Sequence, residues 1–128
     1  MKPIVLLIED NEQNRYLVTF LLERSGYEVR TASSGARGIE LAQRNVPGVI
    51  LLDIQLPQMD GYAVARALRG IPSLREVPII AVTSYAMPGD REKSLAAGCT
   101  GYIEKPIDPH TFVSQMELSL SQPFREPG

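Results

Sequence analysis

The sequence contains a single cysteine, Cys99, and no tryptophan. One thiol cannot form an internal disulfide, and it cannot supply the cysteine clusters that many structural metal sites need. Basic residues are not in excess either, since 13 Lys and Arg stand against 15 Asp and Glu, which gives a net charge of -2. A nucleic-acid-binding domain needs excess positive charge to replace phosphate counterions. The charge balance therefore argues against a nucleic-acid partner.

Long apolar runs are also absent, and none approaches the ~20 residues that a membrane-spanning helix requires. The aliphatic run Ile4 to Ile8 is too short for a secretory signal and is followed directly by acidic residues. We therefore expect a cytoplasmic protein without membrane association. The length of 128 residues and the 44% hydrophobic content are typical of one globular domain.

Three short segments are almost wholly aliphatic: Ile4 to Ile8, Val49 to Leu52 and Val77 to Val82. Runs that are apolar on both faces are typical of strands at the centre of a parallel sheet with helices on both sides. Two weaker strand candidates are Glu28 to Ala32 and Gly101 to Ile103.

Amphipathic segments separate these strands. The apolar spacing and the helix start and stop signals predict helices over Asn14 to Ser25, Ala36 to Arg44, Asp60 to Gly70 and Asp90 to Ala97, and a last helix that begins at Asp108-Pro109 and runs through Leu120. Five strand–helix units predict an α/β fold with right-handed crossovers and a parallel five-stranded sheet. We expect the flavodoxin-like, doubly wound (βα)5 arrangement, in which strands 1 and 3 are neighbours and the order is 2-1-3-4-5. We expect one domain over residues 1–121 and a flexible C-terminal tail over residues 122–128.

Polar residues follow the predicted strands at the edge where open α/β sheets bind their ligands. They are Glu9 and Asp10 after the first strand, Asp53 after the third, Thr83 and Ser84 after the fourth, and Glu104, Lys105 and Pro106 after the fifth. Crowded carboxylates raise each other's pKa unless a cation neutralises them, and Mg²⁺ prefers oxygen ligands. Such a set suits transfer of a phosphoryl group to a carboxylate. Asp53 is the best nucleophile because it stands alone after a fully apolar strand.

Four stretches in this order resemble a response-regulator receiver domain: Ile4 to Asn11, Leu51 to Gly61, Ala81 to Ser84 and Gly101 to Pro106. The resemblance covers nearly the whole chain. It implies that Asp53 is the phosphoacceptor and that Asp10, Asp53 and the backbone carbonyl of Gln55 bind Mg²⁺ or Mn²⁺, with Glu9 acting through water. It also implies that Thr83 and Tyr102 form a switch pair and that Lys105 binds the phosphoryl group and precedes a cis bond to Pro106.

On this resemblance, the chain is a single-domain response regulator of a two-component phosphorelay, similar to chemotaxis and cell-cycle regulators. A histidine kinase or a histidine phosphotransfer protein would donate the phosphoryl group, near Asn14, Arg15, Val18 and the loop of residues 106–108. A downstream protein would read the switched surface. We expect a monomer or a weak phosphorylation-dependent dimer that catalyses only its own phosphorylation and dephosphorylation. A receiver excised from a hybrid histidine kinase is the alternative within this class.

Two other functional classes remain to be weighed. An aspartyl-phosphate phosphatase typically needs a carboxylate two residues after the nucleophile, where this chain has Gln55. A flavin carrier needs a hydroxyl- and glycine-rich loop after the first strand, where the acidic residues 9–12 would repel phosphate. By resemblance, Gln55 and Tyr85 tune the lifetime of the phosphoryl group, and a bulky Tyr85 predicts a long one.

Simpler interpretations stay open for single residues. Asp10 is also suited to cap the first helix, and Lys105 to be a solvated loop lysine. Tyr102 is also suited to be a half-buried core aromatic, and Cys99 to be a small buried hydrophobic residue.

Overall fold

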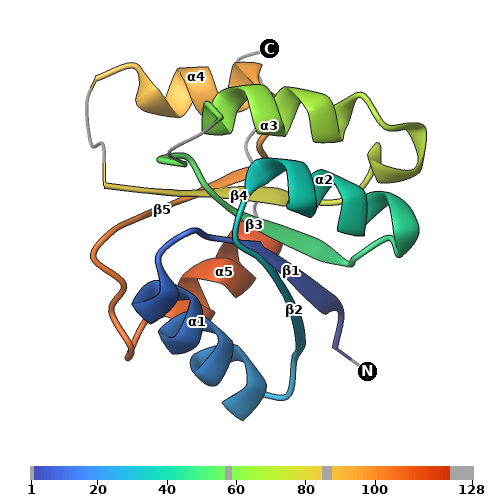
Figure 1. The fold of residues 1–128 in the computed structure, drawn as a ribbon. Helices are drawn as coiled ribbons and strands as arrows, with labels where there is room; N and C mark the ends of the chain where they lie inside the picture. Colours follow the sequence, from blue (N-terminus) through green and yellow to red (C-terminus); the bar gives the residue numbers. More distant parts are fainter. Residues whose placement is uncertain (1, 57–58, 85–87, 122–128) are drawn as a thin grey trace.

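The computed structural model describes residues 2–56, 59–84 and 88–121, in which a five-stranded parallel sheet lies between two layers of helices (Figure 1). The strands are β1 Ile4–Ile8, β2 Glu28–Ala32, β3 Val49–Asp53, β4 Ile79–Thr83 and β5 Gly101–Glu104. Their order in the sheet, β2-β1-β3-β4-β5, confirms the predicted topology. The aliphatic runs form the three inner strands, and every residue of β3 and β4 is buried.

The helices cover both faces of this sheet. They are α1 Glu12–Arg24, α2 Gly35–Arg44, α3 Gly61–Arg69, α4 Asp90–Ala96 and α5 Phe112–Ser121, with a short 3-10 helix at Pro72–Leu74. Figure 1 shows α1 and α5 on one face and α2, α3 and α4 on the other. Each face has its own buried core, because alternate residues of the inner strands point to opposite sides.

The strand register aligns the carboxyl ends of the strands. Ile8 pairs with Leu52, and Asp53 pairs with Val82 on the next strand. Thr83 in turn pairs with Glu104. The residues that follow β1, β3, β4 and β5 therefore leave the sheet along one edge.

Helix and strand ends differ from the prediction by a few residues. Helix α1 begins at Glu12 instead of Asn14, because the Asn11 side chain accepts a 2.8 Å hydrogen bond from the Asn14 backbone and caps the helix. Strand β4 begins at Ile79 instead of Val77, because the Val77 N–H bonds to Leu74 and closes the preceding turn.

The last helix begins at Phe112, three residues later than predicted. Residues 109–111 form a turn, in which an Asp108 side-chain oxygen accepts from the His110 N–H at 2.9 Å and the Asp108 carbonyl accepts from both Thr111 and Phe112. Phe112 and Met116 of this helix are buried against the sheet.

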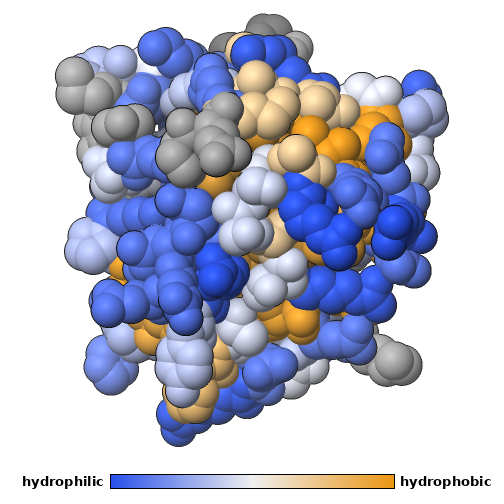
Figure 2. Space-filling model, in the orientation of Figure 1, coloured by the Kyte–Doolittle hydropathy of each residue, from blue (hydrophilic) through white to orange (hydrophobic). Residues whose placement is uncertain are grey.

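Hydrophilic side chains cover most of the face seen in Figure 2, and the broadest hydrophobic patch lies over α2 and α3. Within the described ranges, no helix has the length and apolar character needed to cross a membrane. The predicted tail, residues 122–128, and Tyr85 lie outside the described residues.

Candidate functional site

Three carboxylates come together at the carboxyl edge of the sheet. Glu9 and Asp10 follow β1, and Asp53 ends β3; one carboxylate oxygen from each lies within 4.8 Å of the others. Glu9 and Asp53 are each only 2% exposed, whereas Asp10 is exposed to solvent. The site therefore concentrates negative charge, most of it removed from water.

A single lysine reaches into this cluster from the loop after β5. The Lys105 ammonium lies 3.3 Å from Glu9 Oε1 and 3.4 Å from Asp53 Oδ2, and its side chain is 14% exposed. Its backbone N–H donates to the Thr83 carbonyl at 2.8 Å, and its bond to Pro106 is cis, as the resemblance implied. The solvated-lysine interpretation is therefore wrong.

The pKa of Glu9 reflects its burial first and its carboxylate neighbour second. Burial, followed by the hydrogen bond and the charge of Asp53, raises the pKa of Glu9 from 4.5 to about 7, although Lys105 opposes the shift. Asp53 opposes the ionisation of Glu9 although Lys105 favours it, and a hard divalent cation would relieve this repulsion. The cluster of three carboxylates is an all-oxygen donor set, which fits Mg²⁺.

Backbone hydrogen bonds hold the loops of this edge in place. Asp53 Oδ1 accepts from the Gln55 N–H at 2.9 Å, and Glu9 Oε2 accepts from the Asn11 N–H at 3.3 Å. Arg15 donates to the carbonyls of Glu9 and Asp10 at 3.0 and 3.3 Å. The sequence analysis assigned Arg15 to the surface that contacts the phosphoryl donor and did not predict these hydrogen bonds. A contact between residues six positions apart leaves no periodic pattern in the sequence.

The first helix is capped by Asn11, so the interpretation of Asp10 as its cap is wrong. The Asp10 carboxylate is instead one of the three groups of the cluster.

The predicted switch residues stand on the two neighbouring strands. Thr83 ends β4 and is completely buried, while Tyr102 lies half-buried in β5. Burial, and then the charge of Asp90, raises the pKa of Tyr102 above its ordinary value. The tyrosine is thus a neutral, largely apolar ring at physiological pH.

The side chain of Gln55 connects the ends of β3 and β4. Its Oε1 atom accepts from the Ser84 N–H at 3.0 Å and from the Ser84 hydroxyl. The sequence analysis used the backbone carbonyl of Gln55 as a ligand and, by resemblance, gave residue 55 a role in the lifetime of the phosphoryl group. It did not predict the contact of the side chain with Ser84.

A hollow of about 430 Å³ lies beside the carboxylates, between α1 and the loop after β5. Its lining residues are Asn14, Leu17, Ser84, Lys105, Pro106 and Ile107. It thus includes part of the surface that the sequence analysis assigned to the phosphoryl donor.

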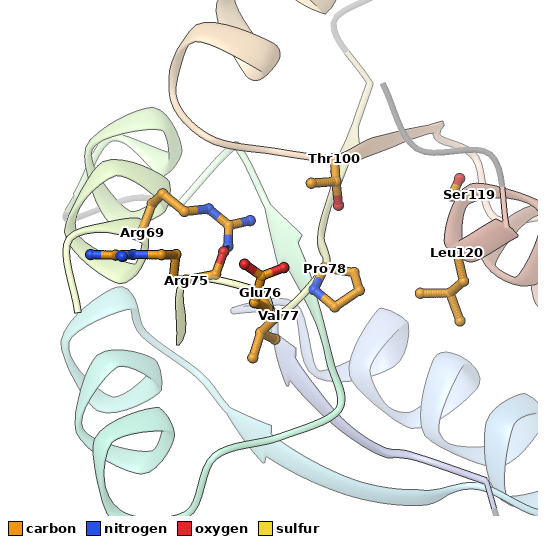
Figure 3. A pocket seen from close by; sticks show the side chains of 8 residues that line it. All are labelled: Arg69, Arg75, Glu76, Val77, Pro78, Thr100, Ser119 and Leu120. Carbon is orange, nitrogen blue, oxygen red and sulfur yellow. The ribbon is translucent and has the colours of Figure 1, made fainter. Parts of the chain in front are cut away.

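A second hollow lies at the opposite end of the sheet (Figure 3), lined by Arg69, Arg75, Glu76, Val77, Pro78, Thr100, Ser119 and Leu120. The Arg69 guanidinium already donates to the carbonyls of Gly98, Leu74 and Arg75. These hydrogen bonds therefore join α3 to the loops that precede β4 and β5.

Comparison with known proteins identifies relatives along nearly the whole chain. The family model of the response regulator receiver domain matches residues 5–117. The polar-differentiation response regulator DivK of Brucella ovis is 42% identical over 120 residues, which cover 94% of this chain and 98% of that protein. The Brucella anthropi protein of the same name is 41% identical over the same length.

Solved structures give the same picture. Chemotaxis protein CheY4 of Vibrio cholerae superposes with a TM-score of 0.88 at 29% identity, covering 93% of this chain and 99% of that one. The receiver domain of the sensor histidine kinase PA1611 from Pseudomonas aeruginosa has a TM-score of 0.82 at 34% identity, covering 95% and 98%. In that relative, a magnesium ion is coordinated in the active site cleft.

Proposed function

The chain belongs to the response-regulator receiver family of two-component signalling, and from this premise we propose that it is a switch phosphorylated on Asp53. The observation that carries the proposal is the buried Asp53 carboxylate, which lies 3.4 Å from the Lys105 ammonium and within a cluster of carboxylates that fits a divalent cation. A histidine kinase or a histidine phosphotransfer protein donates the phosphoryl group.

In the transfer step, one Asp53 carboxylate oxygen forms a bond to phosphorus. The bond between phosphorus and the imidazole nitrogen of the donor breaks, its electron pair stays on that nitrogen, and solvent supplies a proton to the leaving imidazole. Lys105 lies close enough to Asp53 to stabilise the negative charge of the transferred group. The low exposure of Asp53 and Glu9 strengthens such interactions.

Asp10, Asp53 and the backbone carbonyl of Gln55 would hold Mg²⁺ or Mn²⁺, with Glu9 assisting through water. When bound, the cation supplies positive charge to the phosphoryl oxygens. The chain's own contribution is to hold these donors in position, through the backbone hydrogen bonds from Asn11 to Glu9 and from Gln55 to Asp53.

Phosphorylation then changes the surface that a downstream protein recognises. The new oxygens accept from the Thr83 hydroxyl and from Lys105, Thr83 moves inward, and Tyr102 turns into the space it leaves. These residues belong to β4, β5 and the following loop, so the surface of α4, β5 and α5 shifts between two states and binds a downstream protein. We place the receiver domain at residues 1–121, with a flexible tail at residues 122–128.

The protein in this proposal is a cytoplasmic regulator that stands alone, as a monomer or a weak phosphorylation-dependent dimer. The DivK relatives support a free-standing regulator, since the match covers 98% of their length. The PA1611 receiver supports the alternative of a receiver within a hybrid kinase. A phosphatase acting on an external substrate is less suited, because Gln55 cannot transfer a proton and its side chain is already bonded to Ser84.

The experiment is intact-mass spectrometry after incubation with Mg²⁺ and a small acyl phosphate. The parent should gain one phosphoryl group that mild base removes, and Asp53→Asn should gain none. Asp60→Asn is the matched control, because Asn caps helices as well as Asp does and Asp60 caps α3 away from the cluster. Equal labelling of Asp53→Asn and the parent would contradict the assignment of the acceptor.

A further inference from the structure

The outer face of α1 carries two aromatic side chains that are exposed to solvent. Tyr16 is 75% exposed and Phe20 is 49% exposed, and residues four positions apart are neighbours on the surface of a helix. The inner face of the same helix buries Val18 and Leu22 in the core beneath it. A surface helix ordinarily presents polar residues to solvent. An adjacent pair of exposed aromatic residues therefore indicates an interaction surface.

Opposite charges stand at the two ends of this aromatic pair. Glu12 begins α1 and Arg24 ends it, and both residues are exposed. The residues Glu12, Tyr16, Phe20 and Arg24 follow one another at intervals of four, so they form one ridge of the helix surface, which we call the α1 ridge. Among the described residues, the ion pairs involve neither Glu12 nor Arg24. Both charges are therefore available to a partner.

The α1 ridge is complementary to itself when two copies of the helix pack antiparallel. Tyr16 and Phe20 each lie two residues from the middle of the helix at Val18. Glu12 and Arg24 each lie six residues from the same point. A twofold axis at Val18 therefore sets Tyr16 of one copy opposite Phe20 of the other, and it sets each acidic end opposite a basic end. A parallel arrangement would instead set like charges opposite each other.

We propose that the α1 ridge is a docking surface for a second copy of this chain, in an antiparallel dimer that forms without phosphorylation. The aromatic side chains make its centre, where burial and contact between rings stabilise the pair, and two reciprocal ion pairs flank them. Helix α1 has 13 residues and is about 20 Å long. A contact of this length buries less than the ~1,200 to 2,000 Å² of stable interfaces, so the dimer is weak and the dilute protein is a monomer.

The dimer leaves the candidate phosphorylation site accessible. Asn14 lines the hollow beside the carboxylates and is two residues from Tyr16, so the two side chains do not share a side of the helix. The α1 ridge includes neither Asp53 nor Lys105. Each copy in the dimer can therefore still meet a phosphoryl donor. The inference goes beyond the proposed function and does not rest on it.

Sedimentation equilibrium of the unphosphorylated protein, from micromolar to millimolar concentration, tests the association. The parent should show a reversible equilibrium between monomer and dimer. Phe20→Ala should weaken it about tenfold or more, because the substitution removes an aromatic side chain from the centre of the interface. Leu118→Ala is the matched control, at a 57% exposed hydrophobic residue of α5, and should associate as the parent does. A parent that stays monomeric at millimolar concentration overturns the proposal, whatever other protein the ridge binds.

Charge reversal tests the antiparallel arrangement. Glu12→Arg leaves only positive charge at the two ends of the ridge, and Arg24→Glu leaves only negative charge. Each variant alone should associate about tenfold more weakly than the parent, because like charges then face each other. An equimolar mixture of the two variants should recover about the parental strength, since every end then meets its opposite.

The mixture separates the contact from a defect in folding, because mixing does not repair a damaged helix. Glu92→Arg, at an exposed position in the first turn of α4, makes the same change of charge on another helix and should associate as the parent does. A mixture that associates no better than either variant alone overturns the antiparallel contact.

Discussion

The Tyr27 hydroxyl donates a 2.7 Å hydrogen bond to Glu117 Oε2, which joins the start of β2 to α5 across 90 residues of sequence. The Lys2 ammonium completes this group, 4.7 Å from the centre of the Tyr27 ring and 3.8 Å from Glu117. The contact joins the segment before β1 and helix α5 to the start of β2, at the opposite end of the strands from Asp53.

Removing this hydroxyl should lower stability. Tyr27→Phe should reduce the free energy of unfolding by about 1 kcal/mol, the usual value of one hydrogen bond. Burial and Glu117 raise the pKa of Tyr27 from 10.0 to about 12, so the contribution is complete below pH 10 and is lost as the pH rises through about 12. Urea unfolding at pH 7 measures the loss, and Tyr16→Phe, at a 75% exposed tyrosine, is the control. Equal losses in both variants would contradict the assignment.

The Glu9 carboxyl should give the metal-free protein a distinctive pH dependence. Its folded pKa of about 7 lies above the ordinary 4.5, so the folded state binds the extra proton. The stability it contributes is complete below pH 4.5 and is lost as the pH rises through about 7. The neutral variant Glu9→Gln should lack this fall between pH 5 and 8 in urea unfolding without Mg²⁺. Parallel pH profiles for the parent and the variant would count against the shift.

Lysine 105 should be needed for the switch and not for the metal. Lys105→Ala removes a cation that lies 3.3 Å from Glu9, so Mg²⁺ should bind at least as tightly as in the parent. The phosphorylated variant should lose the change at Tyr102, which NMR of the β5 amides would detect. Lys93→Ala, at an exposed position of α4, is the control. Weakened Mg²⁺ binding in Lys105→Ala would refute this division of roles.

The first residue of α3, Gly61, and the residue that caps its end, Gly70, should respond oppositely to alanine. A Cβ at Gly61 would lie 2.4 Å from the Ile54 Cα and 2.5 Å from the Ile54 carbonyl oxygen, and backbone atoms cannot move aside. Gly61→Ala should therefore lower stability by about 1 to 3 kcal/mol. Gly70 has a φ of -75 and its nearest atoms at 3.5 Å, so Gly70→Ala should be neutral or stabilising by up to about 1 kcal/mol. Thermal unfolding of both variants measures the two changes in stability, and similar losses of stability would contradict the prediction.

The thiol of Cys99 should not react with thiol reagents in the folded protein. It is 1% exposed, and burial raises the pKa of its thiol from 9.0 to about 12, against a smaller opposing effect of Arg69. A thiol reagent at pH 8 should label Cys99 in urea and leave the native protein unlabelled. Rapid labelling without denaturant would show that the loop before β5 opens.

Most of the fold could be predicted because hydrophobic patterning is a local property. The runs Ile4 to Ile8 and Val49 to Leu52 are apolar on both faces, and only a covered parallel sheet buries both. Helix ends were less predictable, because they depend on which nearby side chain accepts hydrogen bonds from the backbone N–H groups at the start of the helix. Asn11 caps α1, although Asp10 was also suited to this role. The turn after Asp108 makes α5 begin later than predicted.

The sequence by itself determined the alternation of strands and helices, the edge at which the polar residues gather and the residue types available there, since these follow from apolar runs and from the polar residues at their ends. Only the tertiary structure decided how those residues meet. The contact of Lys105 with Asp53, the raised pKa of Glu9 and the hold of Gln55 on Ser84 join residues of different strands. The physical reason is that burial and distance between side chains arise only when the strands align, and no local pattern in the chain records them.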